Sequence, residues 1–150
     1  MVTAYVALGS NQGDRRAHLR SAVAGLPGVQ RVSGIYETDP VGGPAQEPFL
    51  NCVVELETSL GPHELLARCQ QLEEAADRVR DVRWGPRTLD IDILLYDDVE
   101  VATHDLHIPH PRMAERRFVL RPLADLAPDR CPPGWEERLP ADGVHRVDDL

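Results

Sequence analysis

The spacing of hydrophobic residues changes along the chain, and each change predicts a different element. A short apolar run over residues 2–8 predicts a buried strand that ends in a Gly-Ser-Asn turn. Over residues 14–26 the apolar positions recur every three or four residues, which predicts a helix that Pro27-Gly28 terminates. Residues 29–37 are again strand-like and predict a second strand.

The next residues repeat this order after a Gly- and Pro-rich loop at residues 39–48. Residues 49–57 alternate strictly and predict a third strand. Leu50, Cys52, Val54 and Leu56 face one side of it, and Phe49, Asn51, Val53 and Glu55 face the other. Helical spacing from Pro62 to Val79 predicts a second helix, and residues 89–95 predict a fourth strand.

The resulting order, β-α-β-β-α-β, is typical of a ferredoxin-like α+β fold with an antiparallel sheet and both helices on one face. The other face is then open to a ligand or to additional C-terminal elements. We expect Pro109-His110-Pro111 and a short helical piece ending near Leu120 to border that open face. Residues 122–150 contain several prolines and no clear period. We therefore expect them to form a surface-wrapping C-terminal segment of a single domain, residues 1–150.

Composition and charge narrow the class of protein. The formal net charge of −9 argues against a nucleic-acid partner, which needs a basic surface. No apolar run approaches the roughly 18 residues needed to span a membrane, and the N-terminus does not read as a signal peptide. We therefore expect a cytoplasmic protein with no membrane partner, and we also expect a monomer. The 16 basic residues are all arginine, which excludes a Walker-type loop with its lysine. The three cysteines form no C-x-x-C pair, which favours buried free thiols.

The most informative segment is Arg83-Trp84-Gly85-Pro86-Arg87-Thr88-Leu89-Asp90-Ile91-Asp92-Ile93. Strand alternation places Asp90 and Asp92 on one face, with Cα atoms about 6.5–7 Å apart. That spacing suits carboxylates that share one or two divalent cations. Arg83 and Arg87, immediately before the pair, suit bidentate contacts to phosphate oxygens. The alternative is a structural network of Arg–Asp ion pairs.

Two other polar groups each allow two interpretations. His110 and Arg116 form a second basic group, or else they belong to a turn and to a solvated helix face. The turn at residues 9–13 offers backbone N–H groups to an anion, although a tight turn in which Ser10 or Asn11 caps the helix is favoured.

Phe49 and Asn51 lie on the strand face opposite the expected core. Phe49 offers a stacking surface for a flat heterocycle, and Asn51 offers a donor and an acceptor for an amide-like ring edge. Ordinary packing explains both residues equally well.

Taken together, these segments resemble the family of 6-hydroxymethyl-7,8-dihydropterin pyrophosphokinase, an enzyme of folate biosynthesis. The resemblance runs from Tyr5 to about Pro128, and the Arg83–Ile93 segment is its most specific motif. The other landmarks are Ala7-Leu8-Gly9-Ser10-Asn11, Tyr36-Glu37-Thr38, Phe49-Leu50-Asn51 and Pro109-His110-Pro111 with Arg116 and Phe118. The chain departs from the family at Phe49, which is often a tyrosine, and at Pro111, which is a tyrosine in some members.

The resemblance implies a ferredoxin-like enzyme that transfers pyrophosphate from ATP to the pterin's hydroxymethyl oxygen, with two Mg²⁺ ions, and gives AMP and the pterin diphosphate. It implies that Asp90 and Asp92 hold the metals and that Arg78 and Arg87 act on the phosphates. The positions that match the ATP site are Gln70, Glu73, Arg83, Trp84, Arg87, Ile93, His110 and Arg116. The positions that match the pterin pocket are Thr38, Val41, Phe49, Asn51, Asp90 and Phe118. Which of Arg78, Arg80 and Arg83 acts on the phosphates stays open.

Two other functions stay open as alternatives. A nucleotidyltransferase-like two-metal enzyme also combines a Gly-Ser turn with an acidic pair. In that class the turn lies shortly before the pair, whereas here Ser10 lies 80 residues before Asp90. A non-catalytic, ferredoxin-like ligand-binding module would account for Phe49 and Asn51, but it gives no reason for two aspartates among arginines.

Overall fold

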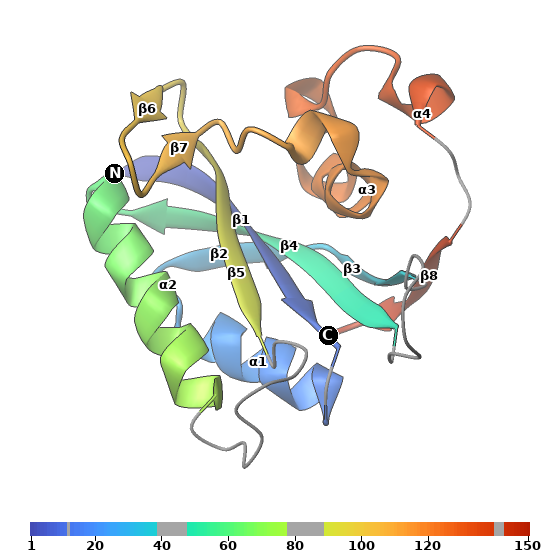
Figure 1. The fold of residues 1–150 in the computed structure, drawn as a ribbon, viewed down its shortest axis with the longest axis horizontal. Helices are drawn as coiled ribbons and strands as arrows, with labels where there is room; N and C mark the ends of the chain where they lie inside the picture. Colours follow the sequence, from blue (N-terminus) through green and yellow to red (C-terminus); the bar gives the residue numbers. More distant parts are fainter. Residues whose placement is uncertain (12, 39–47, 78–88, 140–142) are drawn as a thin grey trace.

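The structure, a computed structural model, describes residues 1–11, 13–38, 48–77, 89–139 and 143–150 (Figure 1). Within these residues an antiparallel sheet has the strand order β5-β1-β4-β3-β8, and β2 also pairs with β4. The strands are β1 (Val2–Ser10), β2 (Val29–Val32), β3 (Gly34–Thr38), β4 (Phe49–Thr58), β5 (Asp90–Tyr96) and β8 (Val144–Asp149). A separate hairpin of β6 (Val101–Ala102) and β7 (His107–Ile108) follows β5.

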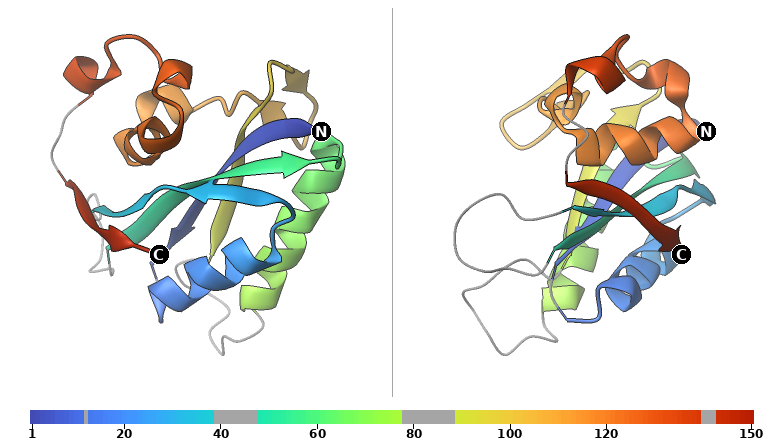
Figure 2. Two further views of the ribbon diagram at one scale, coloured as in Figure 1. Left: turned by 180° about the vertical axis from the view of Figure 1, so that it is seen from behind. Right: turned by 90° about the vertical axis from the view of Figure 1, so that its right-hand side faces the viewer.

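Helices cover both faces of this sheet (Figures 1 and 2). The helices α1 (Arg15–Gly25) and α2 (Pro62–Asp77) pack on one face, and α3 (Arg117–Leu126) packs on the other. Shorter helical turns are η1 (Met113–Glu115), η2 (Pro128–Arg130) and α4 (Trp135–Arg138). The predicted ferredoxin-like α+β fold with additional C-terminal elements is therefore confirmed.

The larger hydrophobic core lies between the sheet and the helices α1 and α2. The predicted alternation of β4 is confirmed, because every second residue from Leu50 to Leu56 is buried in this core. Leu89, Ile91 and Ile93 join it from the β5 segment, each at most 5% exposed. Burial of one such side chain stabilises the fold by about 1.5–3 kcal/mol. The residues between them must then point to the opposite face of the sheet.

A second core lies on that opposite face, beneath α3. It contains Leu94 and Leu95, neighbours in sequence that alternation would place on different faces. The pairing of β1 with β5 shifts between Tyr5 and Val6, so one extra residue is accommodated in β5 at this point. A bulge of this kind interrupts the period of two. As a result, both leucines pack beneath α3, whereas Asp92 precedes the bulge.

The second strand that the sequence predicts is divided in two at Ser33. Val53 N–H donates to the hydroxyl of Ser33 (2.8 Å), which replaces a main-chain carbonyl in the ladder. The Ser33 N–H still donates to the Val53 carbonyl (2.9 Å). Because a side chain takes part in the pairing, the regular ladder stops and starts again, and β2 and β3 both pair with β4.

The helical piece expected to end near Leu120 was predicted wrongly, because a helix begins there instead. The helix α3 starts at Arg117 and continues through Pro122 to Leu126. Proline lacks an N–H group and normally ends or kinks a helix. Here Pro122 is itself buried together with Leu120 and Leu123, so the packing of this face against the sheet outweighs the missing hydrogen bond.

Residues 122–150 also contain elements that no periodicity predicted. The strand β8 pairs antiparallel with β3, with Tyr36 opposite Arg146. Trp135 at the start of α4 is 6% exposed and packs in the second core. This part of the chain therefore extends the sheet at one edge and completes the core under α3.

All three cysteines are buried free thiols, as predicted. Burial raises the pKa of Cys52 and Cys69 to about 12 and that of Cys131 to about 11. The thiolate is the metal ligand and the nucleophile, so these groups are inert near neutral pH. Among the described residues, no helix is both long and apolar enough to cross a membrane.

Gly28 connects α1 to β2 and provides a stability test of this packing. Its φ of +72° disfavours other residues, and a Cβ atom there would overlap the carbonyl oxygen of Glu57. Gly28→Ala should lower the free energy of unfolding by about 3 kcal/mol. Gly134→Ala is the matched control, because Gly134 has a similar φ of +74° but nothing within 4 Å of the added atom. It should lower the same quantity by only about 1 kcal/mol.

Urea denaturation of the two variants and the wild type measures this difference. Equal losses in both variants would mean that backbone conformation alone, and not the clash with Glu57, limits position 28.

Candidate active site

A row of residues crosses four strands on the sheet face opposite α1 and α2. The pairing places Asp90 of β5 opposite Gly9, Gly9 opposite Asn51, and Asn51 opposite Tyr36. Residues directly opposite each other in antiparallel strands point to the same face. The acidic segment and the predicted pterin residue Asn51 are therefore neighbours across β1, although 38 residues lie between Asn51 and Asp90 in the sequence.

Gly9 allows Asn51 to lie across β1. A Cβ atom at position 9 would come within 2.9 Å of Asn51 Oδ1. The Asn51 Nδ2 donates to the hydroxyl of Thr38 (3.0 Å), and the residue is only 8% exposed. The amide is thus fixed between β3 and β1, with its acceptor oxygen over Gly9. This orientation presents a fixed polar edge, as recognition of a polar ring requires.

The two aspartates lie on this face, as predicted from the alternation. Asp90 is half-buried, and the Asp92 side chain is 50% exposed. The described residues contain no group of three or more His, Cys, Asp or Glu side chains that could hold a metal. Mg²⁺ is typically held by one or two carboxylates together with phosphate oxygens and water. Two neighbouring carboxylates with solvent access therefore fit this ion when a phosphate substrate supplies further ligands.

The helix α2 brings two predicted ATP-site residues to the edge of β5. The Ile91 N–H, on the strand between the two aspartates, donates to Glu73 Oε2 (3.0 Å). Gln70 lies nearly one turn earlier on α2 and is exposed. Ile93 is different, because its side chain is buried in the core beneath α1 and α2. The side chain of Ile93 therefore lies on the sheet face opposite Asp92.

His110 lies beside Asp92, with 3.9 Å between His110 Nε2 and Asp92 Oδ1. The Arg112 N–H donates to His110 Nδ1 (3.2 Å), which assigns the ring proton of the neutral form to Nε2. Burial lowers the pKa of His110, the positive charges of Arg116 and Arg112 lower it further, and Asp92 raises it. A neutral ring with a donor N–H directed toward the acidic pair is the result.

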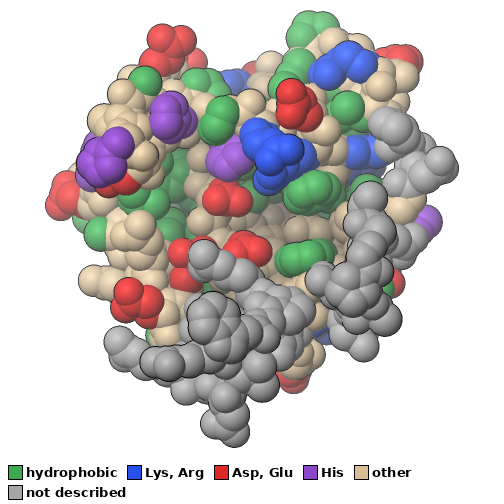
Figure 3. Space-filling model, viewed as in Figure 1, with side chains coloured by type: hydrophobic (Ala, Val, Ile, Leu, Met, Phe, Trp, Pro, Cys, Tyr) green, Lys and Arg blue, Asp and Glu red, His purple; other side chains and the backbone are tan. Residues whose placement is uncertain are grey.

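The two aromatic residues predicted for the pterin pocket lie on this side of the sheet and belong to two different elements, β4 and α3. Phe49 begins β4 opposite Thr38, and Phe118 lies in the first turn of α3, beneath the guanidinium of Arg116 at 5.7 Å. Both rings are half-buried. Figure 3 shows that this side of the molecule is hollowed at its middle, with hydrophobic, acidic, arginine and histidine side chains around the hollow.

Several predicted site residues lie outside the described residues. These are Val41 of the pterin pocket, Arg78 and Arg87 of the catalytic set, and Arg83 and Trp84 of the ATP site. Arg80, the third candidate for contact with the phosphates, is also outside them.

An interaction that sequence analysis missed connects α3 to β3. The hydroxyl of Tyr36 donates to Asp125 Oδ2 (2.8 Å), which also accepts from the Gly34 N–H (3.2 Å). Burial and the hydrogen bond to Asp125 raise the pKa of Tyr36 to about 12. This bond fixes the helix that carries Phe118 relative to the strand that carries Thr38. Its partners are 89 residues apart, and no spacing rule indicates such a pair.

The helix cap at the 9–13 turn also differs from the favoured interpretation. Asp14 caps α1 by accepting from the Ala17 N–H (3.1 Å), so neither Ser10 nor Asn11 is the cap. Both are buried, and in the described part of the chain the Ser10 hydroxyl and the Asn11 amide have no hydrogen-bond partner. The Asp14 carboxylate therefore lies where an anion would approach the start of α1.

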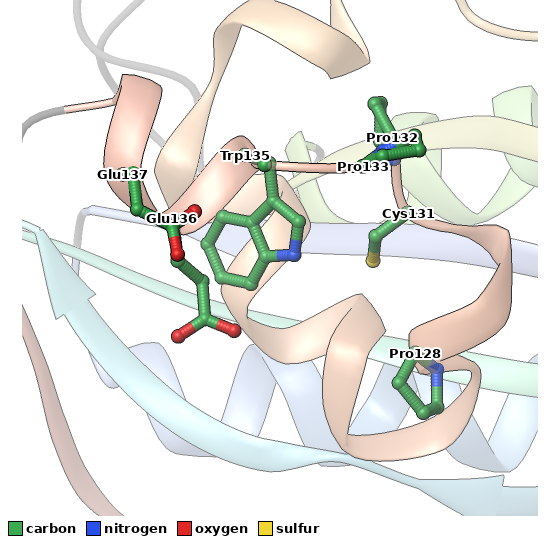
Figure 4. A pocket seen from close by; sticks show the side chains of 8 residues that line it. Pro128, Cys131, Pro132, Pro133, Trp135, Glu136 and Glu137 are labelled. Atoms are coloured by element: carbon green, nitrogen blue, oxygen red, sulfur yellow. The ribbon is translucent and has the colours of Figure 1, made fainter.

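A cavity of about 250 Å³ lies in the C-terminal part of the chain, away from the predicted site residues in sequence (Figure 4). Its lining includes Pro128, Cys131, Trp135 and Glu136. Arg117 lies over the Trp135 ring at 5.2 Å and stabilises this region. None of the lining residues is among those predicted for ATP, metal or pterin.

Comparison with known proteins identifies the family. The model of the family 7,8-dihydro-6-hydroxymethylpterin-pyrophosphokinase (HPPK) matches residues 5–128. The chain belongs to this family. The 2-amino-4-hydroxy-6-hydroxymethyldihydropteridine pyrophosphokinase of Bacillus subtilis is 56% identical over 128 residues, covering 82% of this chain and 77% of the relative. The protein of the same name from Methylorubrum extorquens is 44% identical over 158 aligned positions, covering 99% and 100%.

A solved structure supports the fold of this HPPK member. An HPPK-DHPS crystallised in complex with substrates matches with a TM-score of 0.66 at 14% identity. The match covers 85% of this chain and 40% of the HPPK-DHPS chain. At this identity the likeness concerns the fold alone.

The environment of His110 generates a prediction about its titration. In the metal-free protein its pKa should lie below the ordinary value of 6.5, and Asp92→Asn should lower it further, because the substitution removes a nearby negative charge that favours the protonated ring. NMR titration of the imidazole protons with EDTA present measures both values. An Asp92→Asn variant with a higher His110 pKa would contradict the geometry.

The same shift has a consequence for stability. The unfolded chain has the ordinary, higher pKa and binds the proton more readily than the folded protein does. The contribution of His110 to stability is therefore complete above its ordinary pKa and is lost as the pH falls toward the folded value. His110→Gln should remove this part of the acid sensitivity in denaturation experiments.

Proposed function

We propose that this chain transfers the pyrophosphoryl group of ATP to the hydroxymethyl oxygen of 6-hydroxymethyl-7,8-dihydropterin and releases AMP. The observation that carries the proposal is the row of Asp90, Gly9 and Asn51 across three strands of a member of the HPPK family. Carboxylates suited to metal-bound phosphates then lie one strand away from an amide suited to the pterin. A reaction between ATP and a pterin requires this proximity.

The metal site in this proposal consists of Asp90 and Asp92, with two Mg²⁺ ions. When bound, these ions would neutralise phosphate oxygens and polarise the hydroxymethyl group. The carboxylates of Asp90 and Asp92 would hold the two ions. The hydrogen bond from Ile91 N–H to Glu73 fixes the strand that carries both aspartates. We infer no general base among the side chains.

The ATP half of the proposed site surrounds the edge of β5. Gln70 and Glu73 of α2 and the backbone around Ile93 would contact the nucleoside, while His110 and Arg116 would contact phosphate oxygens. A neutral His110 would present its Nε2–H group on the side of Asp92. From the family resemblance, Arg78, Arg83, Trp84 and Arg87 would complete this half, with Arg78 and Arg87 stabilising the transferred charge.

The pterin half of the proposed site lies over β1, β4 and β3. Asn51, fixed by its bond to Thr38, would recognise the polar edge of the ring. Phe49 and Phe118 would stack on its two faces, a mode in which aromatic side chains favour flat ligands. From the family resemblance, Val41 would contribute to the same pocket.

The decisive experiment is product analysis. The protein is incubated with ATP, Mg²⁺ and 6-hydroxymethyl-7,8-dihydropterin, and the nucleotide products are separated by chromatography. We expect AMP and the pterin diphosphate in equal amounts. Pyrophosphate released with AMP attached to the acceptor would instead indicate a nucleotidyltransferase. Pterin binding without turnover would indicate a non-catalytic module, and ADP would exclude pyrophosphoryl transfer.

A second prediction concerns the metal. Asp92→Ala should lower kcat by at least about 10²-fold, because it removes one of the two proposed metal carboxylates. The Asp92 side chain is half exposed, so the fold should be retained. The matched control is Glu100→Ala, which removes an exposed carboxylate beyond the end of β5. Near-wild-type turnover by Asp92→Ala across a Mg²⁺ titration would refute the metal assignment.

A further inference from the structure

Arg15, the first residue of α1, joins two segments of the sheet that are separate in sequence. Its Nη1 donates to the carbonyl of Pro48 (2.6 Å) and lies 3.2 Å from Glu37 Oε2. Glu37 is the next-to-last residue of β3, and Pro48 directly precedes β4. A single guanidinium nitrogen therefore holds the end of one strand and the beginning of the next.

Both contacts are adjacent to residues of the proposed pterin half. Thr38 follows Glu37, Phe49 follows Pro48, and Thr38 and Phe49 are directly opposite each other in the β3–β4 ladder. Thr38 also accepts the hydrogen bond that fixes Asn51. Arg15 thus contacts the residue next to each member of the Thr38–Phe49 pair.

Arg15 acts from the other side of the sheet. Ile35 is buried under α1 and α2, and alternation along β3 places Glu37 on that same side, whereas Tyr36 bonds to α3 on the opposite side. Arg15 therefore holds the strands from behind and does not contact a ligand on the site face. Its role would be positioning.

The chemistry of the contact suits such a role. The Arg15 and Glu37 side chains are 24% and 31% exposed, so the pair is partly shielded from water. A charge-assisted bond in such surroundings is stronger than a fully solvated ion pair. A cation in the first turn of a helix also opposes the helix dipole, so helix stability does not explain an arginine at this position.

We propose that Arg15 is a positioning residue for the pterin half of the site, in that it fixes the Thr38–Phe49 pair and thereby Asn51. The inference rests on the proposed function. The acidic pair and Glu73 lie on β5 and α2, and the bonds that fix the Ile91 backbone and His110 do not involve Arg15. Loss of Arg15 should therefore weaken pterin binding and leave ATP binding unchanged.

The test compares Arg15→Ala with Arg20→Ala, which removes an exposed arginine from the same helix. We expect Arg15→Ala to raise KM for the pterin about 5-fold, with KM for ATP and kcat within about 2-fold of wild type. Arg20→Ala should change none of these constants. Equal increases in both KM values, or an unchanged KM for the pterin, would overturn the inference.

A double-mutant cycle distinguishes the effect of the Arg15–Glu37 contact from general destabilisation of the protein. Glu37→Gln should raise KM for the pterin by less than Arg15→Ala does, because the carbonyl of Pro48 still accepts from Arg15. Arg15→Ala combined with Glu37→Gln should be no worse than Arg15→Ala alone. Additive effects would overturn the pairing. Arg15→Lys, which retains a donor, should recover part of the affinity and serves as the readout if Arg15→Ala does not fold.

Direct titration of pterin binding by fluorescence distinguishes this inference from the proposed function. Wild-type protein that binds the pterin without releasing AMP would refute the proposed function, and the Kd values of the variants would still test Arg15. Wild-type turnover with an unchanged KM in Arg15→Ala would refute only the role of Arg15. Wild-type protein that neither turns over nor binds the pterin would overturn both.

Discussion

The pairing register of β1 with its two neighbours is the constraint on which the site depends. β1 lies between β4 and β5, and it sets Asp90 and Asn51 at the same level on either side of Gly9. A slip of one residue in either pairing would move the polar groups of that strand to the helix face. Leu50 of β4 and Ile91 and Ile93 of β5, each at most 5% exposed, oppose such a slip, because it would turn their buried side chains away from the core.

The two hydrophobic cores support the row of Asp90, Gly9 and Asn51 in different ways. The core beneath α1 and α2 fixes the register, since the aliphatic residues that alternate with the polar ones are buried there. The core beneath α3 closes part of the opposite face and brings Phe118 toward the strands, with Asp125 bonded to Tyr36. The site therefore occupies the part of this face where polar and half-buried residues replace apolar ones.

The spacing of hydrophobic residues correctly predicted those features that depend only on the two-residue repeat of a strand. The strand faces of Asp90, Asp92, Phe49 and Asn51 follow from alternation, and the family motif then suggested their chemistry. Pro122 misled the helix prediction, because a rule for isolated helices cannot include the burial that compensates the lost hydrogen bond.

Other features depend on contacts between distant segments or on competition among neighbours. The hydroxyl of Ser33 enters the β-ladder, and Asp14 caps α1 although Ser10 and Asn11 are equally suited to capping. The pairing of β8 with β3 joins residues more than a hundred positions apart. A single sequence gives no signal that decides between such partners before the fold brings them together.

The bond between Glu73 and Ile91 N–H has a consequence for association between molecules. In the part of the chain that the structure describes, β5 ends the sheet, and the exposed N–H groups of an edge strand are a template for pairing with a further strand. A carboxylate from α2 occupies one of these donors at the level of the acidic pair. Because this donor is already paired, the Glu73 carboxylate disfavours β-strand addition by another chain at this level of the edge.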